Sequence, residues 1–318
     1  MRKVMSLRSS NDIKAEAYDL GFYACGIAKA GPVDAATASR YREWVDCGSH
    51  GEMGYMQNNI DKRLDPRLLM PGVQSIVSVA MSYAPEQSLP QDSYQISVYA
   101  LGRDYHDLMK ERLHQLAARI GATEYRAFCD TAPVLERYWA WRAGIGWIGR
   151  NHQLIIPGAG SMFFLGELFL TEPLDYDSTL PSRCGKCEAC VRACPSGALS
   201  ISDGVTSFDA RRCLSYQTIE YRGALSAEVV KSMGNRIYGC DTCQQVCPHT
   251  RRGVPTTESA LHPSEQLLSM TPSDWHTLTH EQYLALFRGS AVKRAKYEGL
   301  MRNIRAARES SSAAESDD

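Results

Sequence analysis

The sequence predicts a mixed α/β (α+β) domain at the N-terminus, then a small domain built around cysteines, then a helical segment. Three observations support this fold class. Strand and helix patterns are interspersed up to about residue 177, eight of the 11 cysteines lie between residues 184 and 247, and a basic segment with a helical pattern lies near the end. We place the parts at 1–177, 178–255 and 256–308, followed by a disordered acidic tail at 309–318.

Composition is that of an ordinary globular protein and excludes several classes. The 318 residues include 35 Lys and Arg against 36 Asp and Glu, so the chain is not a bulk polycation, although charge can still gather on one face. Residues 162–170 are the most apolar stretch, which is shorter than the roughly 18 residues of a membrane span and contains Glu167. No apolar run follows the basic N-terminus, so we expect a cytoplasmic protein without membrane contacts.

The first predicted elements are a buried strand and an amphipathic helix. Residues 73–83 are rich in β-branched side chains, which favours a strand. Residues 105–120 have the apolar period of a helix, and Gly121 is well placed to end it. The predicted buried face of this helix comprises Met109, Leu113, Leu116 and Ile120.

Shorter elements follow on both sides of Asp130. Residues 124–129 predict a strand, and residues 133–142 predict a helix that starts at a proline. Residues 152–156 and 162–171 predict two further strands, which a glycine-containing turn would join as a hairpin. The pattern leaves the order of the strands in the sheet open.

The first cysteine run has the spacing C-x2-C-x2-C-x3-C-P. This is the spacing of bacterial ferredoxins that bind [4Fe–4S] clusters. Three cysteines two residues apart can wrap one tight loop around one cube, whereas the fourth points away and ligates the other cube. The run consists of Cys184, Cys187, Cys190 and Cys194.

A second, modified run follows, in which the first cysteine is displaced upstream. It consists of Cys213, Cys240, Cys243 and Cys247. Because the last cysteine of each run serves the other cube, the ligands of both clusters are defined. The first cluster takes Cys184, Cys187, Cys190 and Cys247. The second cluster takes Cys194, Cys213, Cys240 and Cys243.

Zinc is the main alternative for these cysteines. Repeated C-x2-C pairs are often zinc sites, but the first run does not have the ordinary spacing of zinc fingers or ribbons. Disulfides are disfavoured in a reducing compartment. We therefore favour a ferredoxin-like domain with two [4Fe–4S] clusters. The other cysteines, Cys25, Cys47 and Cys129, are predicted to be small core residues.

Two clusters form an electron path, and its end must lie elsewhere in the chain. No G-x-G-x-x-G follows a strand, so a dinucleotide site is not indicated. Residues 104–109 partly match the D-x-H-x-x-G motif of cobalt-ligating histidines, but Met109 stands in place of the glycine. His106 is therefore predicted to be a polar wall residue or a surface residue, not a cobalt ligand.

Asp130 has two possible roles from its place between a strand and a helix. It is a helix cap, or it is an acid facing a ligand at the end of the sheet. A helix N-terminus lowers the pKa of a carboxyl group, whereas a general acid needs a raised pKa. Burial beneath a large apolar cofactor would reverse the balance.

Several further motifs, together with the cysteine runs, resemble those of the epoxyqueuosine reductases. They occur in order over residues 10–305: RLDPR (63–67), GRDYH (102–106), DTAPVLER (130–137), GIGWIGRN (144–151), FFLGE (163–167), CLSY (213–216) and RGSAVKRAK (288–296). The resemblance implies a cobalamin-dependent enzyme that reduces epoxyqueuosine to queuosine at the wobble position of tRNA, the last step of queuosine biosynthesis. It also implies an unidentified low-potential electron donor and a monomeric enzyme.

The resemblance also implies roles for individual residues. Asp130 would donate a proton to the epoxide oxygen. The cobalamin contacts would be Arg63, Ser97, Asp130, Leu154, Ser215 and Asp241. The tRNA contacts would be Arg222, Lys293 and Arg294.

Residues 281–308 predict a helix, and its basic part at 288–308 is consistent with an RNA partner. This part has seven Lys or Arg and one acidic residue, a local net charge of +6 (7 − 1). A solvated terminal helix is the simpler alternative, because charge runs usually face water. The predicted buried positions are Val292, either Ala295 or Lys296, Leu300 and Ile304. Two other classes remain open, namely a dehalogenase-like cobalamin enzyme acting on a small molecule, and an electron carrier without a catalytic centre.

Overall fold

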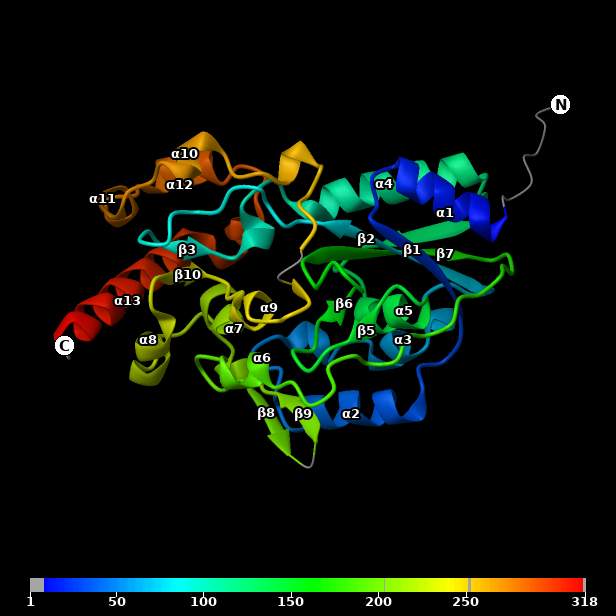
Figure 1. Ribbon diagram of the computed structural model, residues 1–318, viewed down its shortest axis with the longest axis horizontal. Helices are drawn as coiled ribbons and strands as arrows, with labels where there is room; N and C mark the ends of the chain where they lie inside the picture. The colour runs from blue at the N-terminus through cyan, green and yellow to red at the C-terminus, as the bar shows by residue number, and fades with distance from the viewer. Residues whose placement is uncertain (1–8, 203, 251–252, 317–318) are drawn as a thin grey trace.

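A four-stranded sheet lies at the centre of the N-terminal half in the computed structural model, which describes residues 9–202, 204–250 and 253–316 (Figure 1). The strand order is β1-β2-β7-β4, and every neighbouring pair is antiparallel. The strands are β1 (Ala24–Lys29), β2 (Ser75–Ser82), β4 (Tyr125–Phe128) and β7 (Phe163–Leu170). The fold is therefore mixed α/β, of the α+β kind.

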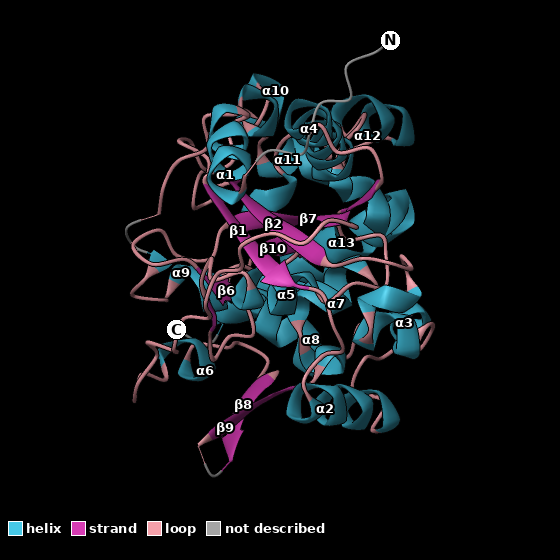
Figure 2. Ribbon diagram, turned by 90° about the vertical axis from the view of Figure 1, so that its right-hand side faces the viewer, coloured by secondary structure: helices cyan, strands magenta, loops and turns pink. Residues whose placement is uncertain are grey.

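Helices cover both faces of this sheet, which is why all eight residues of β2 are buried (Figures 1 and 2). One face packs against α1 (Ser10–Asp19) and α4 (Tyr105–Ile120). The opposite face packs against α5 (Glu136–Arg142). The predicted strand at 73–83 and helix at 105–120 are thus confirmed.

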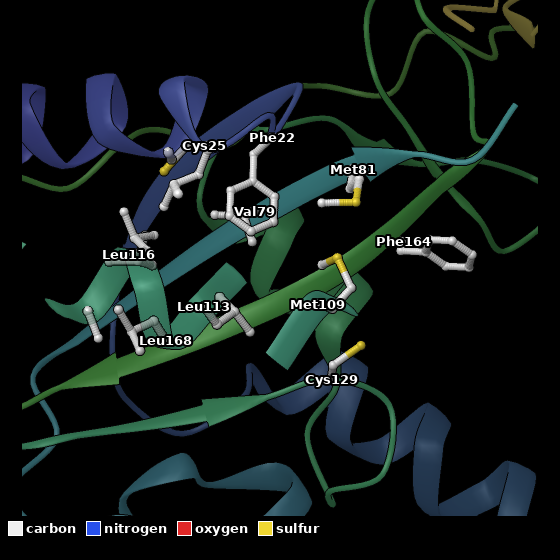
Figure 3. Close-up of a cluster of buried hydrophobic side chains, with 14 of the residues drawn as sticks. Phe22, Cys25, Val79, Met81, Met109, Leu113, Leu116, Cys129, Phe164 and Leu168 are labelled. Carbon is white, nitrogen blue, oxygen red and sulfur yellow. The ribbon is translucent and has the colours of Figure 1, made fainter. Parts of the chain in front are cut away.

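Helix α4 has the predicted buried face and the predicted ends. Side chains of α4 point toward β2 and β7 in Figure 3, where they meet residues such as Val79 and Leu168. The side chain of Asp104 accepts a hydrogen bond from the amide of His106 at the start of the helix, and Gly121 ends it with φ of 76°. The four residues of the predicted face, all fully buried, are Met109, Leu113, Leu116 and Ile120.

The contact between β1 and α5 is too close for any side chain at Gly26. A Cβ added at Gly26 would lie 2.0 Å from the carbonyl oxygen of Ala143. We expect Gly26→Ala to lower the free energy of unfolding by about 1–3 kcal/mol, because the strand or the helix must shift. Thermal unfolding measures this difference in the free energy of unfolding when the variant and the unsubstituted protein carry the same amounts of iron and cobalamin. Gly31→Ala is the matched control, since a Cβ there meets no atom within 4 Å, and an equal loss in both variants would contradict the prediction.

Two elements near the sheet differ from the sequence prediction. Helix α5 begins at Glu136, not at 133, because residues 130–135 form a loop with tight turns from Thr131 to Cys129 and from Val134 to Ala132. The prediction that 152–156 and 162–171 form a hairpin is wrong. The glycine turn closes only one bridge, from Ile156 to Gly160, since β7 pairs inside the main sheet. The first of the two segments pairs elsewhere, as β6 (Leu154–Ile155) with β5 (Trp147–Ile148).

A second core joins segments that are far apart in the sequence. It combines residues 89–101, residues 214–238 and most of the C-terminal helices. Strand β3 (Gln95–Ile96) pairs in parallel with β10 (Arg236–Tyr238), so the cysteine-rich part is bound to the N-terminal part by backbone hydrogen bonds. The remaining elements before the C-terminal helices are α2 (Ala35–Asp46), α3 (Ile60–Leu64), α6 (Ala189–Arg192), β8 (Leu199–Ser202), β9 (Val205–Phe208), α7 (Leu214–Ile219), α8 (Ala227–Met233) and α9 (Thr242–Gln245).

The C-terminal segment is broken into several helices, where the sequence predicts one from 281 to 308. The break falls at Gly289, with φ of 68°, and at Ser290, whose hydroxyl accepts a hydrogen bond from the amide of Val292 and donates one to the carbonyl of Ala100. The helices are α10 (Glu265–Leu268), α11 (Pro272–His276), α12 (His280–Leu286) and α13 (Lys296–Ser316), with a 3-10 turn at Ala291–Ala295. The predicted buried positions are confirmed: Val292, Ala295, Leu300 and Ile304.

Three further expectations can be compared with the structure. The disorder predicted from 309 onward is wrong as far as Ser316, because α13 continues to that residue, and 317–318 lie outside the described residues. Cys25 and Cys129 are buried as predicted, but Cys47 is exposed at the end of α2, so its assignment to the core is wrong. Within the described part of the chain, no helix has the length and apolarity to cross a membrane.

Candidate functional site

Asp130 lies in the loop that joins β4 to α5. Its backbone is left-handed, with φ of 56°, which is uncommon outside glycine. Its amide donates a hydrogen bond to Oε1 of Glu136 in the first turn of α5. Its Oδ2 accepts a hydrogen bond of 2.8 Å from the hydroxyl of Tyr105 and lies 3.1 Å from Nε2 of His106. The loop therefore turns the carboxylate toward the start of α4.

His106 links Asp130 to a second carboxylate. Its Nδ1 lies 2.6 Å from Oδ1 of Asp104, so both ring nitrogens face carboxylate oxygens. Burial by itself would lower the pKa of His106, but the hydrogen bonds to Asp104 and Asp130 outweigh it and raise the pKa to about 9. The network is thus Asp104, protonated His106 and Asp130 in a line.

The same contacts determine the charge on Asp130. The hydrogen bond to His106 lowers the pKa of Asp130, and it prevails over burial, which acts in the opposite direction. Near neutral pH the pair is therefore an imidazolium and a carboxylate, with the proton on His106. A general acid needs a raised pKa, and these residues by themselves do not raise the pKa of Asp130. Burial of Asp130 beneath a cofactor would still be needed to raise it.

The Asp130 side chain is open to solvent and is 60% exposed. Arg137 is also exposed, and Glu136 is half-buried. Charged groups that are held by hydrogen bonds and remain open to solvent are accessible to a bound molecule, which makes this the candidate active site.

Three of the predicted cobalamin contacts come together around Gly239. A Cβ added at Gly239, where φ is 73°, would lie 2.1 Å from Oγ of Ser97 and 3.7 Å from Oγ of Ser215. The carboxylate of Asp241 accepts a 2.8 Å hydrogen bond from the amide of Val98. Burial raises the pKa of Asp241, while Val98 and Ser97 act in the opposite direction. The hydroxyl oxygen of Ser97 is buried and has no hydrogen-bond partner among the described residues.

Apart from Asp130, two predicted cobalamin contacts remain, and they lie in different elements. Arg63 is buried in α3, where its guanidinium donates to the carbonyl of Tyr55 at 3.2 Å and lies over the Tyr41 ring. Its Nε is buried without a partner among the described residues. Leu154 is buried in β6.

The cysteines of the first predicted cluster line one small cavity. All four are present in a cavity of about 60 Å³ beside Arg150 and His249, and they are Cys184, Cys187, Cys190 and Cys247. Burial raises the pKa of Cys190, and the thiols of Cys184 and Cys247 are near enough to add to that rise. Cys247 therefore meets the other run, as fourth-ligand exchange requires.

The second predicted cluster has the corresponding arrangement. Burial raises the pKa of Cys213 to about 11, and Cys240 and Cys194 are near enough to raise it further. Burial also raises the pKa of Cys243, and its neighbours Cys213 and Cys240 raise it further. These side chains are not closed around a single ion: no three His, Cys, Asp or Glu of the described ranges are placed to hold one.

The predicted tRNA contacts differ in their surroundings. Arg222 donates to the carbonyls of Arg294 and Ala295, and Arg294 pairs with Glu220 at 2.8 Å. Lys293 is exposed, and within the described part of the chain no acidic group pairs with it. Of the three, Lys293 is the side chain most available to a phosphate.

Two family models match the chain. One, described as epoxyqueuosine reductase QueG, DUF1730, matches residues 63–131, and one described as a 4Fe-4S double cluster binding domain matches residues 183–250. An epoxyqueuosine reductase from Cellulophaga algicola is 42% identical over 301 residues, which cover 93% of this chain and 97% of the relative. This chain belongs to the epoxyqueuosine reductases.

Solved structures of epoxyqueuosine reductases have the same fold. One, with an epoxyqueuosine-modified tRNA-Tyr stem loop, matches with a TM-score of 0.84 and 26% identity over 96% of this chain and 82% of its own. Another, from Bacillus subtilis, has its catalytic aspartate loop swung out of the active site. It matches with a TM-score of 0.82 and 26% identity, over 96% of this chain and 82% of its own. Membership in the epoxyqueuosine reductases argues against the dehalogenase-like and electron-carrier classes.

Sequence reasoning missed two partners of Asp130. Tyr105 and Glu136 both bond to it, but they lie 25 and 6 residues away and neither is adjacent to a cysteine run. The available signal was that Tyr105 and His106 share the GRDYH motif, and that Glu136 shares a motif with Asp130 itself. The sequence predicts that His106 is a polar wall residue or a surface residue. In the structure it bonds to Asp130, and this hydrogen bond lowers the pKa of the Asp130 carboxyl.

Proposed function

We propose that this epoxyqueuosine reductase converts epoxyqueuosine to queuosine in tRNA, with Asp130 at the reacting epoxide. The observation that carries this proposal is the Asp130–His106–Asp104 series of hydrogen bonds, which ends at the solvent-exposed carboxylate of Asp130. The reaction takes up two electrons and two protons, breaks the two epoxide carbon–oxygen bonds, forms the alkene and releases water. Because the substrate is tRNA, we expect the enzyme to act in the cytoplasm, as a monomer with an external low-potential electron donor.

The two clusters would carry the electrons, each held by three cysteines of one group and one of the other. The shared cavity of the first four cysteines supports this assignment, since a cube needs ligands on all sides. We assign residues 1–177 to the catalytic domain, 178–255 to the ferredoxin-like domain and 256–308 to the helical segment. The second core shows that these parts fold against one another.

The predicted contact residues fit cobalamin, which would supply reduced cobalt for opening the epoxide when it is bound. The amide side chains at the edge of cobalamin need hydrogen-bonding groups, and the buried Ser97 hydroxyl and Arg63 Nε, which have no partner among the described residues, offer two. Ser215 and Asp241 would hold the same edge as Ser97, because Gly239 lets them approach. Leu154 would provide an apolar contact.

The protein's own residues provide the proton for the leaving oxygen. His106 carries it at neutral pH, and the carboxylate of Asp130 lies 3.1 Å from His106 and is exposed to solvent. A cofactor over Asp130 would desolvate the carboxylate and favour transfer of the proton from His106 to Asp130 and on to the oxygen. Asp104 holds the imidazole by its other nitrogen. The Asp130 loop is this chain's counterpart of the loop that is swung out in the Bacillus subtilis enzyme.

The test of the function is a nucleoside assay on epoxyqueuosine-containing tRNA with protein purified without oxygen. Protein loaded with cobalamin and reduced by a chemical donor should convert epoxyqueuosine to queuosine, and iron and cobalt should be present in a ratio near eight to one, as two four-iron clusters and one corrin require. Colourless protein that holds zinc, or loaded protein without activity on this tRNA, would contradict the proposal.

Binding of tRNA should depend steeply on salt, and Lys293 should contribute to that dependence. We expect Lys293→Gln to reduce the slope of log K against log salt by about 0.7–0.9, the loss of one phosphate contact. Fluorescence titration of a labelled stem loop measures the slope. Lys29→Gln, at an exposed lysine that ends β1, is the control, and an equal slope in both variants would contradict the assignment.

Arg222 and Arg302 are unsuitable for the same test. Arg222 caps two carbonyls before α13, and Arg302 donates to the carbonyls of Gln217, Tyr221 and Gly223. Both guanidinium groups therefore hold the C-terminal helix against α7. Weaker tRNA binding in their variants would report on packing as well as on phosphate contacts.

A further inference from the structure

Two carboxyl groups behind the Asp130 loop, the buried Glu167 and the half-buried Glu136, have no part in the steps above. Glu167 is fully buried in β7, on the face of the sheet that packs against α5. It lies in register with Ser78 of β2 on one side and Phe128 of β4 on the other. Neither its carboxylate oxygens nor the Ser78 hydroxyl has a hydrogen-bond partner among the described residues. Such a group is costly to keep in a sheet centre, so its retention needs an explanation.

Glu136 connects this buried carboxyl to the active site. It is the first residue of α5, the helix that packs on β7, and its Oε1 accepts a hydrogen bond from the amide of Asp130. Burial, and then the charge of Asp130, raise the pKa of Glu136 to about 8, while Arg137 and His106 act in the opposite direction. Burial and the nearby Glu136 raise the pKa of Glu167 as well. The two carboxyl groups therefore do not both ionise, and a largely neutral Glu136 resembles a glutamine.

The Asp130 backbone needs such a restraint. A residue other than glycine with φ of 56° is in an unfavourable backbone conformation, which persists only where surrounding contacts hold it. The hydrogen bonds inside the loop, from Thr131 to Cys129 and from Val134 to Ala132, are local and can move with it. The bond to Glu136 joins the loop to a helix that packs on the sheet.

We propose that Glu136 is a positioning residue for Asp130: its carboxyl accepts the hydrogen bond of the Asp130 amide and keeps the loop in the conformation that turns Asp130 toward His106. We call this hydrogen bond the latch. The catalytic role of Asp130 in this inference rests on the proposed function, whereas the hydrogen bond from Asp130 to Glu136 does not. When the latch opens, Asp130 loses its contacts with Tyr105 and His106, and the loop is free to leave the site.

Hydrogen–deuterium exchange of the Asp130 amide tests the latch without cofactor or tRNA. Glu136→Met nearly keeps the length of the side chain but removes the acceptor, whereas Glu136→Gln keeps an acceptor oxygen. In peptides that cover residues 129–134, we expect about tenfold faster exchange at Asp130 in the Met variant, and exchange close to that of the unsubstituted protein in the Gln variant. Glu124→Met, on an exposed residue next to β4, is the control and should change nothing.

A second measurement separates positioning from general loosening. The pKa of His106, raised in part by Asp130, should fall in Glu136→Met and stay high in Glu136→Gln, as followed by NMR of labelled histidine. If Glu136→Met does not fold, Glu136→Ala takes its place in both measurements. Unchanged exchange in the variant without an acceptor, or equal acceleration in the Met and Gln variants, would overturn the proposal.

Activity distinguishes a failed latch from a failed function. With saturating tRNA, we expect Glu136→Met to lower kcat and leave KM unchanged, because the substrate still binds but the proton donor is misplaced. Exchange results as expected with no reductase activity in the unsubstituted protein would keep the latch and refute the function. Reductase activity with no change in exchange would do the opposite.

Discussion

Asp130→Asn should lower the single-turnover rate on epoxyqueuosine tRNA by about 10²- to 10⁴-fold, the usual contribution of one acid group. The amide keeps the shape of the side chain and can still accept the hydrogen bond from Tyr105, but it cannot pass a proton from His106 to the epoxide oxygen. Both clusters should be retained, because Asp130 belongs to neither cysteine run. Cobalamin should stay bound as well, because its five other predicted contacts are unchanged. Rapid-quench nucleoside analysis, with iron and cobalt determination on the same sample, measures both.

The charge of His106 provides the internal control for this variant. Asp130→Asn removes one of the two carboxylates that raise the pKa of His106, so that pKa should fall below about 9 while Asp104 still supports it. The stabilisation that folding gains from protonated His106 is present at low pH and is lost as pH rises through about 9. In the variant this loss should begin at lower pH. Turnover equal to that of the unsubstituted enzyme would reduce Asp130 to a loop residue.

Cys247→Ser should remove one of the two clusters, and it should be the cluster held by the first run. Iron should fall from about eight to about four atoms per chain, because each cube holds four. Reductase turnover should be lost, since the electron path is interrupted. The cavity that Cys247 shares with Cys184, Cys187 and Cys190 is the reason for this assignment.

Double variants make the exchange of fourth ligands testable. Cys184→Ser added to Cys247→Ser should cost no further iron, because both residues serve one cube. Cys213→Ser added to Cys247→Ser should remove nearly all iron, because the residues serve different cubes. Cys47→Ser, at the exposed cysteine outside both runs, is the control. If the double variants show the reverse pattern, each run holds its own cluster, and one zinc per chain in place of iron would refute the clusters altogether.

Much of the fold could be predicted from periodicity and from end signals. The β-branched run at 73–83 became the fully buried β2, and the apolar stripe of α4 became its core face. Both patterns are local, since they depend on which face of one element is apolar. The hairpin prediction failed because the partner of a strand is chosen by the whole sheet, and β7 finds its partners in β2 and β4.

The C-terminal segment shows the same distinction within one stretch of chain. The buried positions were correct, since apolar spacing determines them, but the single long helix was not. Gly289 and Ser290 end the pattern because Ser290 bonds to Ala100, 190 residues away. The seven basic residues looked alike in sequence, whereas in the structure Arg302 and Arg294 are engaged and Lys293 is exposed.

Cysteine spacing predicted the two clusters, and the ordered motifs predicted the family with its cobalamin. The spacing of cluster cysteines depends on the size of a cube and the reach of a short loop, so a linear sequence is enough to recognise it. The charge of Asp130 and the restraint on its loop could be found in the folded chain alone. Those depend on Asp104, His106 and Glu136, whose distances from Asp130 are fixed by the packing of α4 and α5 on opposite faces of one sheet. A pKa responds to what is near in space, and no local pattern in the chain records that.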